Sequence, residues 1–120
     1  MSMNFMQMVA EAKASVEEVT VHEFQNNNHQ SYTLVDVREP AEYSAGHAIG
    51  AINIPRGVLE MELSGNPEFQ NKDKELVLMC MSGGRSALAA VSISKLGYSK
   101  VKSMAGGYQQ WDAEGLPTTQ

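Results

Sequence analysis

The segment Cys80-Met81-Ser82-Gly83-Gly84-Arg85 combines a nucleophile, two glycines and a permanent cation in one short stretch. Glycine readily adopts positive φ, so successive backbone N–H groups of such a loop can point inward and form an anion-binding nest. A helix that begins near Arg85 would add unsatisfied N–H groups and the positive end of its dipole. These features stabilise a thiolate, and they equally suit a persulfide, whose terminal sulfur is anionic. The segment therefore predicts that Cys80 is a nucleophile that carries sulfur.

Two features of this segment bear on competing interpretations. A lone cysteine after an apolar strand is often only a small buried hydrophobe, but the Gly-Gly-Arg that follows favours the catalytic interpretation. Cysteine-dependent phosphatases use a Cys-x5-Arg loop that surrounds a tetrahedral phosphate, whereas only four residues separate Cys80 from Arg85. The tighter loop suits a single sulfur better than a phosphoryl group. A thiolate also attacks without proton transfer, so no general base is required.

The elements expected around this loop alternate between strand and helix. The run 76–79 is continuously apolar, as in a strand covered on both faces, and the segment 85–96 has the apolar period of a helix. Further strands are expected at 19–21, 33–37, 51–54 and 101–103, and further helices at 5–16, 41–43, 57–63 and ending at 111. This alternation predicts an α/β domain with a mainly parallel central sheet flanked by helices. Ligands bind at the carboxyl ends of such strands, which is where Cys80 falls.

Composition restricts the class of protein further. With 120 residues, the chain is expected to form one domain at residues 18–120, preceded by a helical extension at 1–17 that packs on it. The net charge of −5 and the scattered basic residues predict no nucleic-acid partner. No apolar stretch is long enough to cross a bilayer, and no signal-peptide pattern is visible, so a cytoplasmic location without membrane association is expected. A reducing compartment also keeps the single cysteine available for chemistry.

Metal and cofactor sites are not expected. One cysteine cannot form a disulfide or a thiolate zinc cluster, and the three histidines lack the spacing of metal ligands. His47 is interpreted as a turn residue and Trp111 as a core residue rather than as groups of a site.

Three blocks of the sequence resemble the rhodanese family over nearly the whole chain. The first runs from Leu34-Val35-Asp36-Val37-Arg38-Glu39-Pro40 through Gly46-His47-Ala48-Ile49-Gly50 to Ile54-Pro55. The second is the loop from Cys80 to Ser86, and the third is Gly106-Gly107-Tyr108-Gln109-Gln110-Trp111 followed by Gly115-Leu116-Pro117. The order and spacing of the blocks make the resemblance specific.

The resemblance implies a rhodanese-like three-layer domain and a single-domain thiosulfate sulfurtransferase without cofactors. Cys80 would accept sulfane sulfur from thiosulfate or a persulfide and pass it to cyanide or a thiol. Its substrate-binding surface would be formed by Met81, Ser82, Gly83, Gly84 and Arg85. Asp36 and Arg38 would brace the loop, Ser86 would donate a hydroxyl or begin the helix, and Arg56 could add positive potential for an anionic donor. Arg56 could equally be an ordinary surface arginine.

Two alternatives remain at this stage. The protein could be a sulfur-relay module that a partner protein loads with persulfide. A strongly basic loop would carry Lys or Arg where this sequence has Met81 and Ser82. Their presence weakens the case for a preference for thiosulfate. A phosphatase or arsenate reductase is the weaker alternative, because the loop is one residue short.

Overall fold

The structure is a computed structural model that describes residues 2–26 and 31–120. Its strands are β1 (Glu17–Thr20), β2 (Thr33–Asp36), β3 (His47–Ala48), β4 (Ile52–Asn53), β5 (Leu76–Met79), β6 (Val101–Ala105) and β7 (Thr118–Thr119). Its α-helices are α1 (Phe5–Ser15), α2 (Val21–Asn26), α3 (Pro40–Ala45), α4 (Leu59–Gly65), α5 (Gly84–Ser94) and α6 (Gly107–Ala113). Two 3-10 turns, η2 (Arg56–Val58) and η3 (Pro67–Phe69), flank α4.

The central sheet has five parallel strands in the order β1-β6-β5-β2-β4. β5 lies in the middle, and all four of its residues are buried. Leu76 and Leu78 face one apolar cluster, while Val77 and Met79 face another, because alternate residues of a strand point to opposite faces. The continuous apolar run therefore marks the central strand, as the sequence predicted.

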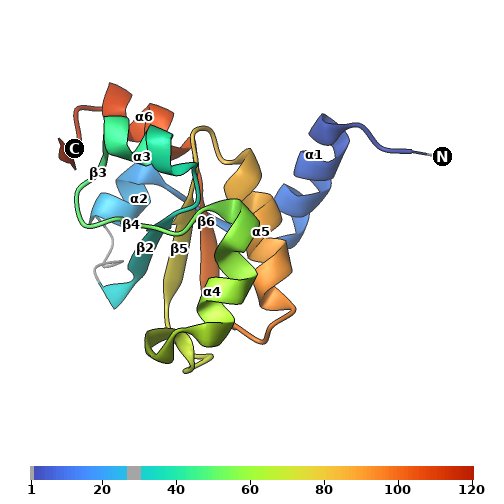
Figure 1. Cartoon of the computed structure of the whole chain (residues 1–120). Coiled ribbons are helices and arrows are strands. Elements are labelled where there is room, and N and C mark those ends of the chain that lie inside the picture. Colours follow the sequence, from blue (N-terminus) through green and yellow to red (C-terminus); the bar gives the residue numbers. More distant parts are fainter. Residues whose placement is uncertain (1, 27–30) are drawn as a thin grey trace.

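Helices cover both faces of the sheet (Figure 1). The cluster on one face contains residues of α4 and α5, and the cluster on the other contains residues of α2 and α6. The three-layer α/β fold expected from the sequence is confirmed. No helix of the described ranges is long and apolar enough to span a bilayer.

The expected elements differ from the structure in a few places. Val21, assigned to a strand, begins α2, and the short antiparallel pair β3–β7 was not predicted. The asparagine run 26–28, whose composition predicts a break between two elements, lies partly outside the described residues. α1 packs against α5 through Val9 and Ala12, whereas Phe5 and Met8 of the same helix remain exposed.

Candidate active site

The three sequence blocks meet at one edge of the sheet. β2 and β5 are parallel and in register, with Asp36 opposite Met79, so the residues that follow the two strands emerge side by side. β6 pairs with the other side of β5 and leads directly into α6. The loop of residues 80–86, here the Cys80 loop, lies between the segments that follow β2 and β6.

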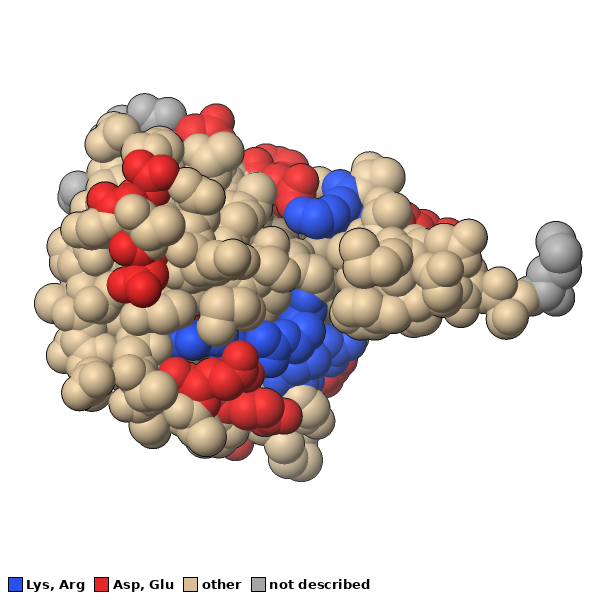
Figure 2. Space-filling model, turned by 90° about the horizontal axis from the view of Figure 1, so that it is seen from above, with Lys and Arg blue, Asp and Glu red and all other residues tan. Residues whose placement is uncertain are grey.

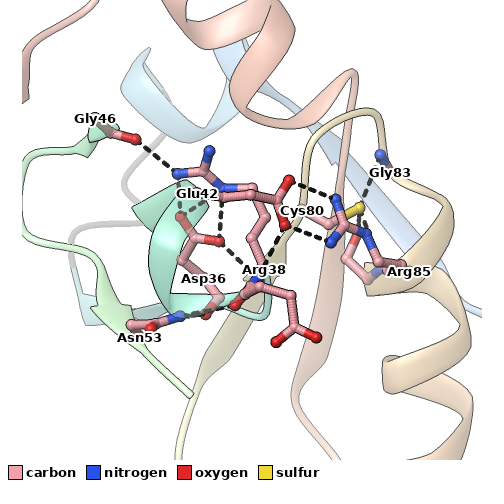
Figure 3. A network of polar contacts seen from close by, with 10 residues as sticks. Asp36, Arg38, Glu42, Gly46, Asn53, Cys80, Gly83 and Arg85 are labelled. Carbon is pink, nitrogen blue, oxygen red and sulfur yellow. Dashed lines mark hydrogen bonds and ion pairs between the residues drawn. The ribbon is translucent and has the colours of Figure 1, made fainter. Parts of the chain in front are cut away.

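Cys80 lies at the base of this loop and is only 1% exposed. Its Sγ accepts a hydrogen bond from the backbone N–H of Gly83 at 3.1 Å (Figure 3). It accepts a second one from the backbone N–H of Ser86 at 3.4 Å. Gly83 has a φ of 105° and is the N-cap of α5, so the turn that presents its N–H requires a left-handed residue. Two amide donors at the start of an eleven-residue helix form a site that favours negative charge on sulfur.

Ser86 contributes its hydroxyl as well as its backbone. Its Oγ lies 3.6 Å from Sγ of Cys80 and 2.8 Å from Oγ of Ser103 on β6. A hydroxyl rotates to suit its partner, so Ser103 can donate to Ser86 while Ser86 donates to a thiolate. Ser103 is a member of the site that the sequence did not single out, because a lone serine in a strand has no distinguishing pattern.

The third sequence block holds the peptide groups of the Cys80 loop in place. The N–H of Tyr108 donates to the carbonyl of Cys80 at 2.8 Å, and that of Gln109 donates to the carbonyl of Met81 at 2.9 Å. Both donors belong to the first turn of α6, whose N–H groups have no partner within the helix. Gly107, the first residue of α6, lies directly against the carbonyl groups of Cys80 and Met81. The orientation of the Cys80 loop therefore depends on this close contact between the two backbones.

A single methyl group at position 107 is expected to disrupt this contact. A Cβ on Gly107 would overlap the carbonyl oxygen of Cys80 and lie 2.8 Å from that of Met81, both backbone atoms that cannot move cheaply. We expect Gly107→Ala to lower the free energy of unfolding by about 3 kcal/mol. It should also slow any reaction at Cys80, as measured by alkylation kinetics of this single thiol and by urea unfolding.

Gly115→Ala is the matched control for this experiment. Gly115 also has a positive φ, 71°, but a Cβ there would meet nothing within 4 Å. Gly115→Ala should lower the free energy of unfolding by only about 1 kcal/mol, through backbone strain, and leave the reactivity of Cys80 unchanged. Equal effects of the two substitutions would show that backbone strain, not the contact with the loop, accounts for the loss.

Arg85 does not present a free positive charge to the loop. Its guanidinium donates to both carboxylate oxygens of Glu42 on α3, at 2.8 and 3.1 Å, and Figure 3 shows the two groups facing each other beside Cys80. The hydrogen bond from Arg85 holds the pKa of Glu42 at about 2 against an ordinary 4.5, and the same pair raises the pKa of Arg85. Glu42 was missed in the sequence because it lies far along the chain from its partner.

The depressed pKa of Glu42 has a consequence for stability. Because the folded value lies below the unfolded one, the ion pair stabilises the folded protein fully above pH 4.5, and this contribution is lost as the pH falls towards 2. We expect Glu42→Gln to be less stable than the natural protein at pH 7 by about 1 kcal/mol or less, given partial exposure. Urea unfolding at a series of pH values should show the difference shrinking over that window. A difference that persists at pH 2 would contradict this.

A second ion pair braces the end of β2. Arg38 donates to both oxygens of Asp36 and also to the carbonyl of Gly46 at 2.8 Å, and its guanidinium lies 4.3 Å from the ring centre of Tyr108. The side chains of Asp36 and Arg38 are 0% and 2% exposed. These contacts join the first and third sequence blocks behind the Cys80 loop.

Two other basic side chains lie in different places. Arg56 donates to Glu60 at 2.9 Å and lines a groove between α1 and α5, and no hydrogen bond or ion pair in the described ranges joins it to residues 80–86. Lys13 of α1 was not anticipated: its Nζ lies 3.4 Å from where a Cβ of Gly83 would stand. In the described ranges, no group of three His, Cys, Asp or Glu side chains is placed to hold a metal.

A buried cysteine at a strand end, with amide donors from a short loop and a helix start, is the arrangement of an α/β protein that favours negative charge on a cysteine sulfur. The family follows from the sequence as a whole. The chain belongs to the rhodanese-like domain family, whose model matches residues 20–114.

Individual relatives agree with this assignment. The chain is 40% identical over 97 residues to thiosulfate sulfurtransferase 16, chloroplastic, of Arabidopsis thaliana, covering 72% of this chain and 79% of that protein. Among solved structures it resembles the human single-domain sulfurtransferase TSTD1, with a TM-score of 0.75, 31% identity and coverage of 83% of this chain and 98% of the other. It also resembles a Rhodopseudomonas palustris protein of unknown function described as a possible tyrosine phosphatase, with a TM-score of 0.87, 30% identity and coverage of 99% and 96%.

Proposed function

We propose that this protein is a sulfurtransferase that moves sulfane sulfur from thiosulfate or a persulfide donor to a thiol or cyanide, through a persulfide on Cys80. The observation that carries the proposal is the pair of amide donors, Gly83 and Ser86, directed at a buried Sγ. The sulfurtransferase named in Arabidopsis, which is 40% identical, supports the same activity.

The first half-reaction loads the cysteine. The Cys80 thiolate attacks the outer sulfur of the donor, a new S–S bond forms, and the donor's own S–S bond breaks. With thiosulfate, sulfite leaves with the electron pair. The donors around Sγ hold the thiolate before attack, and remaining N–H groups of residues 81–85 would bind the terminal sulfur of the persulfide, about 2 Å further out.

The second half-reaction returns the enzyme to its starting state. A thiolate or cyanide attacks the terminal sulfur, the S–S bond to Cys80 breaks, and the cysteine leaves as a thiolate stabilised by the same amides. In this scheme Arg85 positions the loop through Glu42, while Asp36 and Arg38 brace it from behind. We propose the cytoplasm as its location, because both half-reactions need a thiol that stays reduced.

Mass spectrometry of the intact protein tests the proposal directly. Incubation with thiosulfate or with a persulfide should leave the protein one sulfur atom heavier, and cyanide or a thiol should reverse the gain. Because the chain has one cysteine, the site of addition is unambiguous. A folded protein that gains no sulfur from any donor would refute the proposed activity.

The persulfide-relay alternative predicts a different pattern of loading. A relay module would accept sulfur slowly from small donors and quickly from a protein such as a cysteine desulfurase. Comparing loading rates from thiosulfate and from a persulfide-bearing protein separates the two functions.

The description of the R. palustris protein as a possible tyrosine phosphatase makes hydrolysis of an aryl phosphate worth measuring. We expect none, because the Cys80 loop is one residue shorter than the loop that surrounds a phosphate.

A further inference from the structure

The basic side chains around the Cys80 loop are matched by carboxylates. Arg85 is held by both oxygens of Glu42. Lys13, which lies beside Gly83, has its Nζ 2.6 Å from Glu18. Figure 2 shows this face from above, where a group of basic atoms near the middle is bordered on one side by acidic ones. The positive charges of Arg85 and Lys13 are therefore already paired with carboxylates, and little positive charge remains to attract a doubly charged donor such as thiosulfate.

A hollow of about 290 Å³ adjoins the loop on the side of α3. It is lined by Arg38, Glu42, Ala45, Gly46, Met81 and Tyr108. Arg38 is already bound to Asp36, so the surface left for a ligand consists mainly of the Met81 and Tyr108 side chains and the carboxylate of Glu42. This hollow, here the Met81 hollow, suits an uncharged organic group better than a sulfonate.

We propose that the Glu42 carboxylate is a specificity determinant, which makes the site prefer an organic persulfide, with its carbon group in the Met81 hollow, to thiosulfate. The inference rests on the proposed sulfurtransferase function. Thiosulfate carries two negative charges and has to approach beside an ionised carboxylate whose arginine partner is already engaged. A persulfide carries at most one charge, on the sulfur that the loop amides bind.

The reaction with such a donor is balanced without a further reactant. The Cys80 thiolate attacks the terminal sulfur of R–S–S–H, the bond between the two donor sulfurs breaks, and R–S⁻ leaves with the electron pair. The product on the enzyme is Cys80–S–S–H. The released thiolate needs no sulfite-binding group, so the absence of a free cation among the described residues of the Met81 hollow does not hinder this step.

The substitution Glu42→Gln removes the negative charge and one of the two hydrogen bonds from Arg85. Glutamine preserves the reach of the side chain and its acceptor oxygen, which receives the N–H of Glu39 at 3.0 Å in a capping box at the start of α3. The carbonyl can still accept one hydrogen bond from Arg85. Glu68→Gln is the matched control, because it removes the same charge from the exposed 3-10 turn η3, at the opposite end of β5 from the loop.

The measurement is kcat/KM for two donors, thiosulfate and the persulfide of N-acetylcysteine methyl ester, whose tail is uncharged. We expect the natural protein to prefer the persulfide. Glu42→Gln should raise the ratio of kcat/KM for thiosulfate to kcat/KM for the persulfide about fivefold, the scale of one partly exposed charge. Glu42→Asp, which keeps the charge, should retain most of the natural preference, and Glu68→Gln should change neither value.

The outcomes separate this inference from the function on which it rests. If neither donor adds sulfur to Cys80, the sulfurtransferase proposal itself fails. If sulfur is added but Glu42→Gln changes both donors equally, Glu42 acts only as a structural support and the inference is overturned. A natural protein that prefers thiosulfate would overturn it as well.

Discussion

Replacing Cys80 with serine is expected to abolish sulfur transfer, lowering the rate by at least about 10³-fold, because no other group can carry the sulfur between donor and acceptor. Serine keeps the shape of the side chain and can still accept the N–H groups of Gly83 and Ser86. Its hydroxyl is a far weaker nucleophile at neutral pH than a stabilised thiolate. Steady-state assays and intact-mass measurement after donor treatment should both show no product.

The fold of the Cys80→Ser variant must be checked alongside its activity. Trp111 is the only tryptophan and is buried, so its fluorescence during urea unfolding reports on the whole domain. We expect the variant to unfold cooperatively, with stability close to that of the natural protein. A stable variant that still turned over thiosulfate or a persulfide would exclude a covalent route through Cys80.

Removing Arg38 is expected to produce the largest loss of stability. Asp36 is completely buried, and Arg38 supplies the hydrogen bonds to both of its carboxylate oxygens. Breaking a buried ion pair by removing one partner leaves an uncompensated charge, which costs about 3–5 kcal/mol. We therefore expect Arg38→Met to shift the urea midpoint of Trp111 fluorescence strongly downward, a loss that is a large share of the usual stability of a small domain.

The double variant Asp36→Asn/Arg38→Met is the control for this prediction. It removes both charges, so it should recover a substantial part of the stability lost in Arg38→Met. If the double variant were less stable than the single one, the loss would come from the packing of Arg38 on Tyr108 rather than from an unpaired carboxylate. A single variant within about 1 kcal/mol of the natural protein would contradict the buried-charge argument.

The central strand and the loop after it were predictable because their signals are local. Four consecutive apolar residues at 76–79 indicate a strand buried on both faces, and the glycines of the Cys80 loop indicate a turn into a helix. The alternation of elements then implied the α/β fold, since parallel strands need helical crossovers. The two-residue strands β3 and β7 escaped prediction, whereas β4, equally short, lies in the segment 51–54 that the sequence indicated.

The sequence by itself determined the fold class, the rhodanese-like family and Cys80 as the candidate nucleophile, because each depends on neighbouring residues or on the order of blocks. The tertiary structure decided which distant groups surround that cysteine. It placed Glu42 on Arg85, Ser103 on Ser86 and the N–H groups of Tyr108 and Gln109 on the loop carbonyls. These contacts join residues that only the parallel register of the strands and the packing of the helices bring together, so no local pattern could reveal that the arginine at the end of the loop is already neutralised.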